Sequence, residues 1–300
     1  MDANVNFEVS DKRRAVWDAE LSMVKEVQRI CERHNLQYFA VYGTLLGAIR
    51  NEGFIPWDDD IDIAMFREDY EKFLEYAKTE LPESIFLQTS ETEEDYFFGH
   101  TKLRLNHTSA IRYVQYPENY RFHQGVFMDV FALDNVPDGK IAYAVHRKIA
   151  GWMLSLIYYA KYYYRVNYHA PAAQIKHKIV TLLLPTNRAV RRTYRIYQRW
   201  IQLPNRKNTR RCAVTSPFYH LDECIWEKSW LESTVKKPFQ GIELPVPAEF
   251  DAVLKKNYGD YMRPVQEPSA HGGGILYDFE HDYRDYYNGK RSFTKEDLMF

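Results

Sequence analysis

The sequence contains few cysteines, and their arrangement excludes two common kinds of site. Only Cys31, Cys212 and Cys224 occur among 300 residues, an odd number with no Cys-x-x-Cys pair. Neither a disulfide framework nor a zinc-binding cluster is therefore indicated. Three cysteines of this kind fit the reducing environment of the cytoplasm.

The sequence also lacks a long apolar run and a leader-like beginning. Its longest apolar run, 149–160, has 12 residues, fewer than the roughly 20 that a membrane-spanning helix needs. Residues 1–5 show neither the basic start nor the apolar core of a signal peptide. We therefore expect a cytoplasmic protein, with peripheral contact at the inner face of the cell membrane as an option.

Acidic residues are absent from one extended stretch. Between 139 and 221 the sequence has 16 Lys and Arg but no Asp or Glu, which leaves 24 of the 40 basic residues and all 41 acidic residues elsewhere. The chain thus divides into a basic segment of formal charge +16 and a remainder of −17. Apolar spacing predicts helices over 149–159, 175–184 and 188–203 in this segment.

Three interpretations of this basic, aromatic-rich segment remain open. It can be a helical subdomain with a solvated cationic face, a surface that attaches to an anionic membrane, or a platform for a phosphorylated or lipid-linked glycan. A need for a neutral surface does not explain 83 residues without an acid, so we expect the second and third to act together. Nucleic acid is excluded as a partner in this interpretation, because the other half of the chain is acidic.

Among the features that are present, the acidic run 58–62 is the most informative. It places four Asp in five positions, interrupted only by Ile61. In a strand, Ile61 faces the core while Asp60 and Asp62 point to the opposite face, about 7 Å apart at Cα. Aligned like charges repel one another, so the pattern indicates a shared cation. A solvated acidic loop is the alternative, and the spacing does not match an EF-hand.

A second pattern lies just before this run. Residues 37–42 predict a β-strand, and Gly43 and Thr44 follow it at the start of a short helix, 44–50. Backbone N–H groups at a helix start are unpaired and carry partial positive charge, and glycine lets a ligand approach them closely. The sequence therefore predicts a phosphate cradle followed by a metal-binding Asp-x-Asp strand.

A third carboxylate interrupts an apolar strand pattern at 126–131, where Asp129 is the lone acid. A buried carboxylate is costly unless it is paired or binds a metal. One interpretation is that Asp129 caps a turn or pairs with Lys102 or Arg104. The other is that it completes the metal site or takes a proton from an acceptor hydroxyl. Lys102 and Arg104 leave one face of a predicted strand, and we expect them to contact phosphates.

These patterns together resemble the LicD family, which includes the fukutin-related proteins. The resemblance rests on 42–50, on 53–63 and on further blocks at 102–104, 125–134, 258–264 and 271–272, so it covers roughly 20–135 and 240–280. One departure is Asn51-Glu52, where a His or a basic residue is expected. The resemblance implies a magnesium or manganese ion held by Asp60, Asp62 and Asp129. It also implies that the donor nucleotide binds at the following residues: Gly43, Thr44, Lys102, Arg104 and His271.

The resemblance also implies an activity. Members of the family move a phospho-alcohol such as phosphocholine from a CDP-alcohol donor to a sugar hydroxyl of a surface glycan, and CMP is released. Nucleotidyl transfer from CTP is the alternative reaction, because the related superfold more often transfers a nucleoside monophosphate. A non-catalytic scaffold that binds glycan or membrane is a further alternative.

The predicted architecture is α/β, with a nucleotidyltransferase-like mixed sheet flanked by helices and a basic helical insertion. We expect a catalytic core at 1–138, the insertion at 139–211 and a C-terminal part at 212–300 that completes the catalytic domain. The other predicted elements are helices over 13–35 and 67–80, and strands over 60–65, 85–90, 96–105, 109–115 and 126–131.

Overall fold

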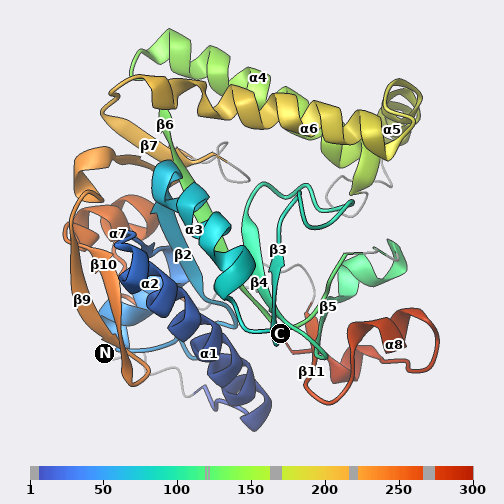
Figure 1. The fold of residues 1–300 in the computed structure, drawn as a ribbon, viewed down its shortest axis with the longest axis horizontal. Helices are drawn as coiled ribbons and strands as arrows, with labels where there is room; N and C mark the ends of the chain where they lie inside the picture. Colours follow the sequence, from blue (N-terminus) through green and yellow to red (C-terminus); the bar gives the residue numbers. More distant parts are fainter. Residues whose placement is uncertain are drawn as a thin grey trace.

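The structure is a computed structural model that describes residues 7–118, 120, 122–162, 171–215, 222–265 and 274–299. Its centre is a mixed seven-stranded sheet, in which the path β1-β2-β6-β4-β3 is extended by β7 and β8. Helices flank this sheet (Figure 1), so the predicted α/β class is confirmed. The strand bounds are β1 Phe39–Ala40, β2 Asp62–Phe66, β3 Ile85–Gln88, β4 Thr101–Leu105, β6 Phe127–Val136, β7 Arg211–Val214 and β8 Ile225–Glu227.

Strand β6 organises the sheet, and all ten of its residues are buried. Its parallel partner β2 places Asp62 opposite Asp129. Its other side pairs antiparallel with β4 and then with β7. A strand that is buried between two neighbouring strands has a nearly continuous apolar sequence. The single acid in the predicted strand 126–131 therefore departs from the expected pattern.

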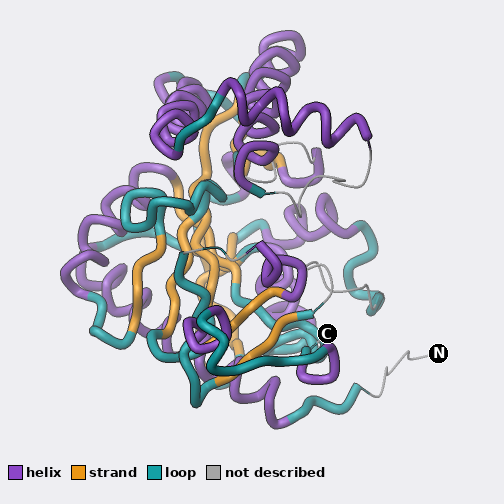
Figure 2. The backbone as a smooth tube through the Cα atoms, turned by 90° about the vertical axis from the view of Figure 1, so that its right-hand side faces the viewer, coloured by secondary structure: helices purple, strands orange, loops and turns teal. Residues whose placement is uncertain are grey.

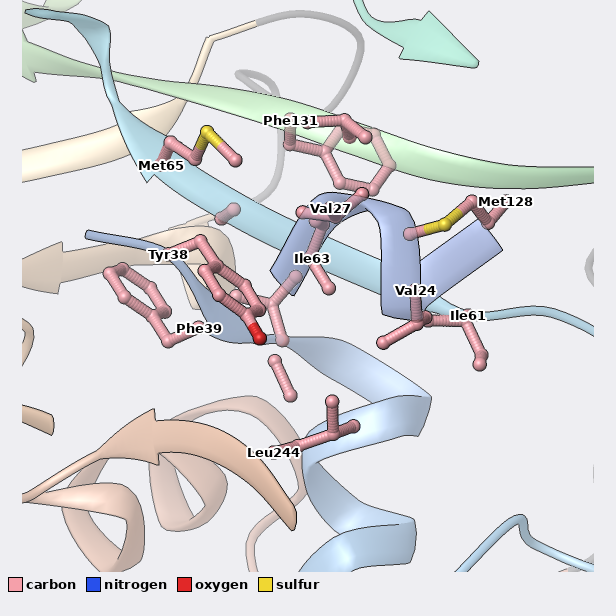
Figure 3. Close-up of a cluster of buried hydrophobic side chains, with 14 of the residues drawn as sticks. Val24, Val27, Tyr38, Phe39, Ile61, Ile63, Met65, Met128, Phe131 and Leu244 are labelled. Carbon is pink, nitrogen blue, oxygen red and sulfur yellow. The ribbon is translucent and has the colours of Figure 1, made fainter. Parts of the chain in front are cut away.

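Two amphipathic helices pack on the sheet, α1 Asp11–His34 and α3 Arg67–Glu80. The Ser10 hydroxyl caps α1 by accepting from the Arg13 N–H, and Asn35 ends it in the left-handed conformation. Figure 3 shows how α1 inserts its apolar stripe among side chains from β2 and β6. The buried residues in this contact include Val24, Val27, Ile61, Ile63, Met65, Met128 and Phe131.

Local bounds differ from the predicted ones near the acidic run. Strand 37–42 shortens to β1, because Tyr42 adopts φ 50° and begins helix α2, Tyr42–Arg50. Strand 60–65 begins only at Asp62, and strand 96–105 only at Thr101. The C-terminal part contributes the hairpin β9 Thr234–Phe239 with β10 Ile242–Pro247, and helix α7 Phe250–Tyr258, both of which pack on α2 or β1.

The predicted strand 109–115 lies outside the central sheet. Strand β5, Ser109–Arg112, pairs antiparallel with β11, Ile275–Asp278, and the short helix α8, Tyr283–Tyr287, packs beside them. These elements bury an aromatic cluster of their own that includes Tyr283 and Tyr286. A strand partner more than 160 residues away was not visible in the local pattern.

The basic segment forms three helices at one end of the molecule, α4 Lys140–Lys161, α5 Pro171–Leu183 and α6 Asn187–Gln202. Figures 1 and 2 both show this helical layer beyond the end of the sheet, on the side away from α1 and the hairpin. The chain returns to the sheet at β7. None of the described helices combines the length and apolar character needed to cross a bilayer.

Candidate active site and metal centre

Three predicted carboxylates converge at the centre of the sheet. Asp62 begins β2, Asp129 is its register partner on β6, and Asp60 precedes β2 by two residues. One carboxylate oxygen from each lies within 4.8 Å of the others. Asp58, Asp59 and Asp60 form a second group that meets the same criterion, so Asp60 belongs to both.

The start of helix α2, with Gly43 and Thr44, lies against this cluster. A Cβ atom at Gly43 would come within 2.4 Å of Oδ2 of Asp58, so any larger residue there would force that carboxylate to move. The buried Thr44 hydroxyl accepts a 2.8 Å hydrogen bond from the Asp62 N–H. Thr44 thereby fixes the backbone at the first residue of β2, and its hydroxyl proton remains available for donation.

The acidic loop is held from two further directions. Arg13 and Trp17 of α1 both donate to the Asp58 carbonyl, at 2.9 and 3.0 Å. From β11, the Tyr277 hydroxyl lies 3.3 Å from the carbonyl and a carboxylate oxygen of Asp59. These contacts leave the loop little freedom to spread its charges apart, which favours binding of a cation there.

Lys102 lies at the carboxylates and pairs with Asp129, while its predicted contact with phosphates stays a prediction. Its Nζ donates to both carboxylate oxygens of Asp129 at 2.6 Å, and His100 Nε2 lies 3.4 Å from Oδ1. Two expectations for Asp129 thus coincide, since it belongs to the acidic cluster and also pairs with Lys102. Arg104 turns elsewhere: its Nε donates to Gln88, and Nη1 to the Gly125 carbonyl.

The pKa values of two carboxylates in the cluster are shifted in opposite directions. Burial, together with the charges of Asp60 and Asp129, raises the pKa of Asp62 well above its usual value. Burial also opposes ionisation of Asp129, but Lys102 and His100 outweigh it and hold the pKa of Asp129 below its usual value. Burial lowers the pKa of Lys102 to about 8, against the opposing pull of Asp129. Lys102 is therefore still mainly protonated at neutral pH.

Glu20 of α1 is a residue near the site that sequence reasoning missed. It is fully buried, and neither carboxylate oxygen has a hydrogen-bond partner among the described residues. Burial, and then the charges of Asp60 and Asp59, raise its pKa well above the usual value. The signal was present in the sequence, because Glu20 occupies an apolar position of α1 between Val16 and Val24.

The C-terminal block 258–262 also returns to the site. Helix α7 packs on α2, and Arg50 at the end of α2 donates to the Tyr261 carbonyl. Although the Tyr258 side chain is 43% exposed, burial of its hydroxyl group and the nearby charges of Asp62 and Asp58 raise its pKa above the usual value. His271, the remaining predicted site residue, lies outside the described residues.

The donor set suits a hard divalent cation. Carboxylate oxygens are the ligands that magnesium and manganese prefer in proteins. Burial first, and then repulsion from the charges of Asp60 and Asp129, raises the pKa of Asp62. A cation between Asp60, Asp62 and Asp129 would relieve that repulsion, so the residues present fit the predicted metal.

Comparison with known proteins agrees with this geometry. The family model described as LicD/FKTN/FKRP, nucleotidyltransferase domain, matches residues 35–187. Lipopolysaccharide cholinephosphotransferase LicD of Haemophilus influenzae is 26% identical over 254 residues, which cover 84% of this chain and 92% of that protein. An uncharacterized protein of Rickettsia prowazekii is 28% identical over 113 residues, 35% of this chain and 42% of its own.

The fold and site define an α/β protein with an acidic cluster at the junction of two parallel strands and a helix start beside it. The matched region includes α2, the acidic run and Asp129. The chain belongs to the LicD family.

Proposed function

We propose that this protein is a metal-dependent phosphotransferase. It moves a phospho-alcohol, phosphocholine or a related group, from a CDP-linked donor to a sugar hydroxyl of a cell-surface glycan and releases CMP. The observation that carries the proposal is the convergence of Asp60, Asp62 and Asp129 beside the start of α2. Similarity to a lipopolysaccharide cholinephosphotransferase over most of both chains supports the choice of phosphocholine as the first donor group to test.

Magnesium or manganese would be held by Asp60, Asp62 and Asp129. When bound, such an ion neutralises negative charge on a pyrophosphate and stabilises the departing phosphate. In such a site Lys102 would keep Asp129 ionised and would add one more positive charge near the phosphates. Asp58 and Asp59 would support the site through the loop contacts described above.

The start of α2 would bind the phosphate oxygens of the donor. Its first N–H groups have no partner within the helix, and the partial positive charge of a helix start favours an anion. The Thr44 hydroxyl accepts from Asp62 and retains a proton that it can donate toward a ligand. Helix start and carboxylates are therefore coupled by one hydrogen bond, so that a phosphate and its cation would be positioned together.

The chemical step balances as a substitution at phosphorus. The acceptor hydroxyl oxygen forms a bond to the phosphorus that carries the alcohol, the bond from that phosphorus to the CMP oxygen breaks, and the hydroxyl proton passes to water. Asp129 is poorly suited to take this proton, because Lys102 and His100 keep its pKa low. Its low pKa suits a ligand that must stay ionised, so we assign Asp129 to metal binding rather than to base catalysis.

Nucleotide product analysis tests the proposal. Purified protein is incubated with magnesium and a panel of CDP-alcohols, with a lipopolysaccharide or other surface glycan as acceptor, and the nucleotide products are identified by mass spectrometry. CMP that accumulates together with phospho-alcohol on the glycan supports phosphotransfer. No product from any CDP-alcohol, in a protein that is folded by circular dichroism, would contradict it.

The alternative reaction is nucleotidyl transfer from CTP, since the matching family model is named for a nucleotidyltransferase domain. Incubation with CTP and phosphocholine separates the two, because that reaction releases pyrophosphate. A scaffold without activity is separated by thermal unfolding, since a protein that binds magnesium and CDP-choline unfolds at a higher temperature in their presence. Unchanged unfolding temperatures would favour the scaffold.

A further inference from the structure

The three helices of the basic segment bury one stripe each. On α4 the buried residues are His146, Ala150, Met153 and Ile157, and on α6 they are Val190, Tyr194, Tyr197 and Ile201. These stripes pack on one another and on the sheet in a single cluster that includes Val136 of β6 and Ala213 of β7. Helix α5 packs on α4 through Ala173 and Val180. The stripes that pack the segment against itself and the sheet therefore all lie on its inner side.

The opposite side of α4 and α5 is apolar as well. On α4, Ile141 is 82% exposed and Trp152 is 64% exposed, and they share a stripe on the side opposite the buried residues. On α5, Ile175, Ile179 and Leu182 form a stripe at i, i+4 and i+7 with exposures of 60%, 53% and 81%. Ordinary solvated helices carry polar residues there.

The exposed large apolar side chains are concentrated on these three helices. Eight of the fourteen exposed large apolar side chains in the described part of the protein belong to α4, α5 and α6: Ile141, Val145, Trp152, Ile175, Ile179, Leu182, Leu183 and Ile196. Single exposed apolar residues are normal on a protein surface, but eight of them on α4 and the two helices that pack on it indicate a site of interaction.

The three helices of the segment contain no Asp or Glu and carry only basic charges, although Asp222 and Glu91 from outside these helices pair with Arg147 and Arg195. Arg188, Arg192, Arg195 and Arg199 recur at i, i+4, i+7 and i+11 on the exposed side of α6. On α5, Lys176 and Lys178 flank the apolar stripe on its two sides. The whole stretch 139–221 has no acid. Cations with long aliphatic stems beside exposed Ile, Leu and Trp are typical of helices that lie in a lipid headgroup region.

We propose that the outer face of α4, α5 and α6 docks on an anionic phospholipid surface. A nucleic acid would use the arginines but would not favour exposed Ile175 and Leu182. A phospholipid surface uses both, because the headgroups attract Lys and Arg and the upper acyl region accepts apolar side chains. The proposal is independent of which group the carboxylate site transfers.

Vesicle flotation tests the proposal without any activity measurement. We expect the full chain to float with vesicles of phosphatidylcholine and phosphatidylglycerol, and at least tenfold less with phosphatidylcholine alone. High salt should release it, because screening weakens attraction to headgroups. Equal recovery with both vesicles, or recovery with neither, would overturn the proposal.

Two matched pairs of variants locate the surface. Ile179→Ser with Leu182→Ser should lower flotation at least tenfold, whereas Val235→Ser with Met262→Ser, also exposed but outside these helices, should leave it unchanged. Arg192→Gln with Arg199→Gln should lower it, whereas Lys25→Gln with Lys236→Gln changes net charge equally and should not. Flotation that responds equally to test and control variants would contradict the assignment.

Trp152 gives an independent readout of contact. Brominated acyl chains quench tryptophan that enters the lipid, so vesicles with brominated lipid should quench the native protein more than Trp152→Phe. Equal quenching in the two proteins would place the contact elsewhere. Self-association that the Ile179→Ser and Leu182→Ser changes abolish, without any vesicle binding, would assign the face to protein contact and overturn the proposal.

Discussion

Lys102 Nζ lies 2.6 Å from both carboxylate oxygens of Asp129, and the two side chains are buried together on neighbouring strands. Lys102 also lies over the Phe127 ring, 3.6 Å from its centre. The pair keeps the Asp129 carboxylate ionised inside the sheet. It therefore links the stability of the fold to the state of the site.

Removing Lys102 should destabilise the metal-free protein. Lys102→Met leaves Asp129 buried without its cation, which costs about 3–5 kcal/mol in comparable buried pairs. Magnesium should restore part of the loss, because it supplies another positive charge to Asp129. Urea unfolding with and without magnesium measures both effects. The double variant Lys102→Met with Asp129→Leu should lose less stability and should not respond to magnesium; equal stability of Lys102→Met and the native protein in EDTA would contradict the account.

Thr44 should contribute through one hydrogen bond. Thr44→Val keeps the side-chain shape but leaves the buried Asp62 N–H without its acceptor, at a cost of about 1–3 kcal/mol. Thr44→Ser retains the oxygen and serves as the control. Chemical unfolding of both variants checks this, and a Val variant as stable as the Ser variant would show that the bond to Asp62 contributes nothing.

Sequence reasoning identified the carboxylates because they break local rules. Asp60 and Asp62 are charges at the start of a strand, and Asp129 is an acid inside an apolar run. The same logic applied to Glu20, an acid within the buried stripe of α1, and the prediction missed it because one Glu in a charged helix is unremarkable. Periodicity also gave α3 its observed bounds and α5 and α6 bounds close to theirs, whereas α4 begins at Lys140, nine residues before the predicted start at 149.

Other features depended on contacts that no local pattern contains. The turn of Arg104 toward Gln88 and Gly125 is set by neighbouring strands. The pairing of β5 with β11 joins segments that are far apart in the sequence. The early start of α2 follows from the left-handed conformation of Tyr42, which a non-glycine residue adopts only where the surrounding structure requires it.

Glu20 should make stability fall as the pH rises. Its native pKa is raised far above that of an unfolded glutamate, so between the two values the native chain holds a proton that the unfolded chain has lost. The contribution of Glu20 to the free energy of unfolding is fully present below about pH 4.5. It decreases by as much as about 1.4 kcal/mol per pH unit above that pH. Glu20→Gln removes that dependence, so its stability relative to the native protein should increase from pH 5 to 7 in urea titrations. A constant difference across this range would show that Glu20 is ionised in the native protein.

His123 should act in the opposite direction at mildly acidic pH. Its Nδ1 accepts from the Gly125 N–H, Nε2 contacts Asn106, and burial lowers its pKa to about 3. As the pH falls below about 6.5, His123 therefore binds a proton in the unfolded chain but not in the native chain. The free energy of unfolding consequently decreases as the pH falls from about 6.5 toward 3. His123→Gln should flatten this part of the unfolding profile. An unchanged slope between pH 6.5 and 5 would mean that His123 is already protonated in the native protein.

Calorimetric titration with magnesium in the presence of CDP-choline tests the central assignment most directly. The native protein should bind the ion with measurable heat, Asp60→Asn with Asp62→Asn should abolish that heat, and Asp251→Asn, an exposed acid on α7, should leave it unchanged. Equal heats from the native protein and the Asp60→Asn, Asp62→Asn variant would contradict a metal centre at these carboxylates.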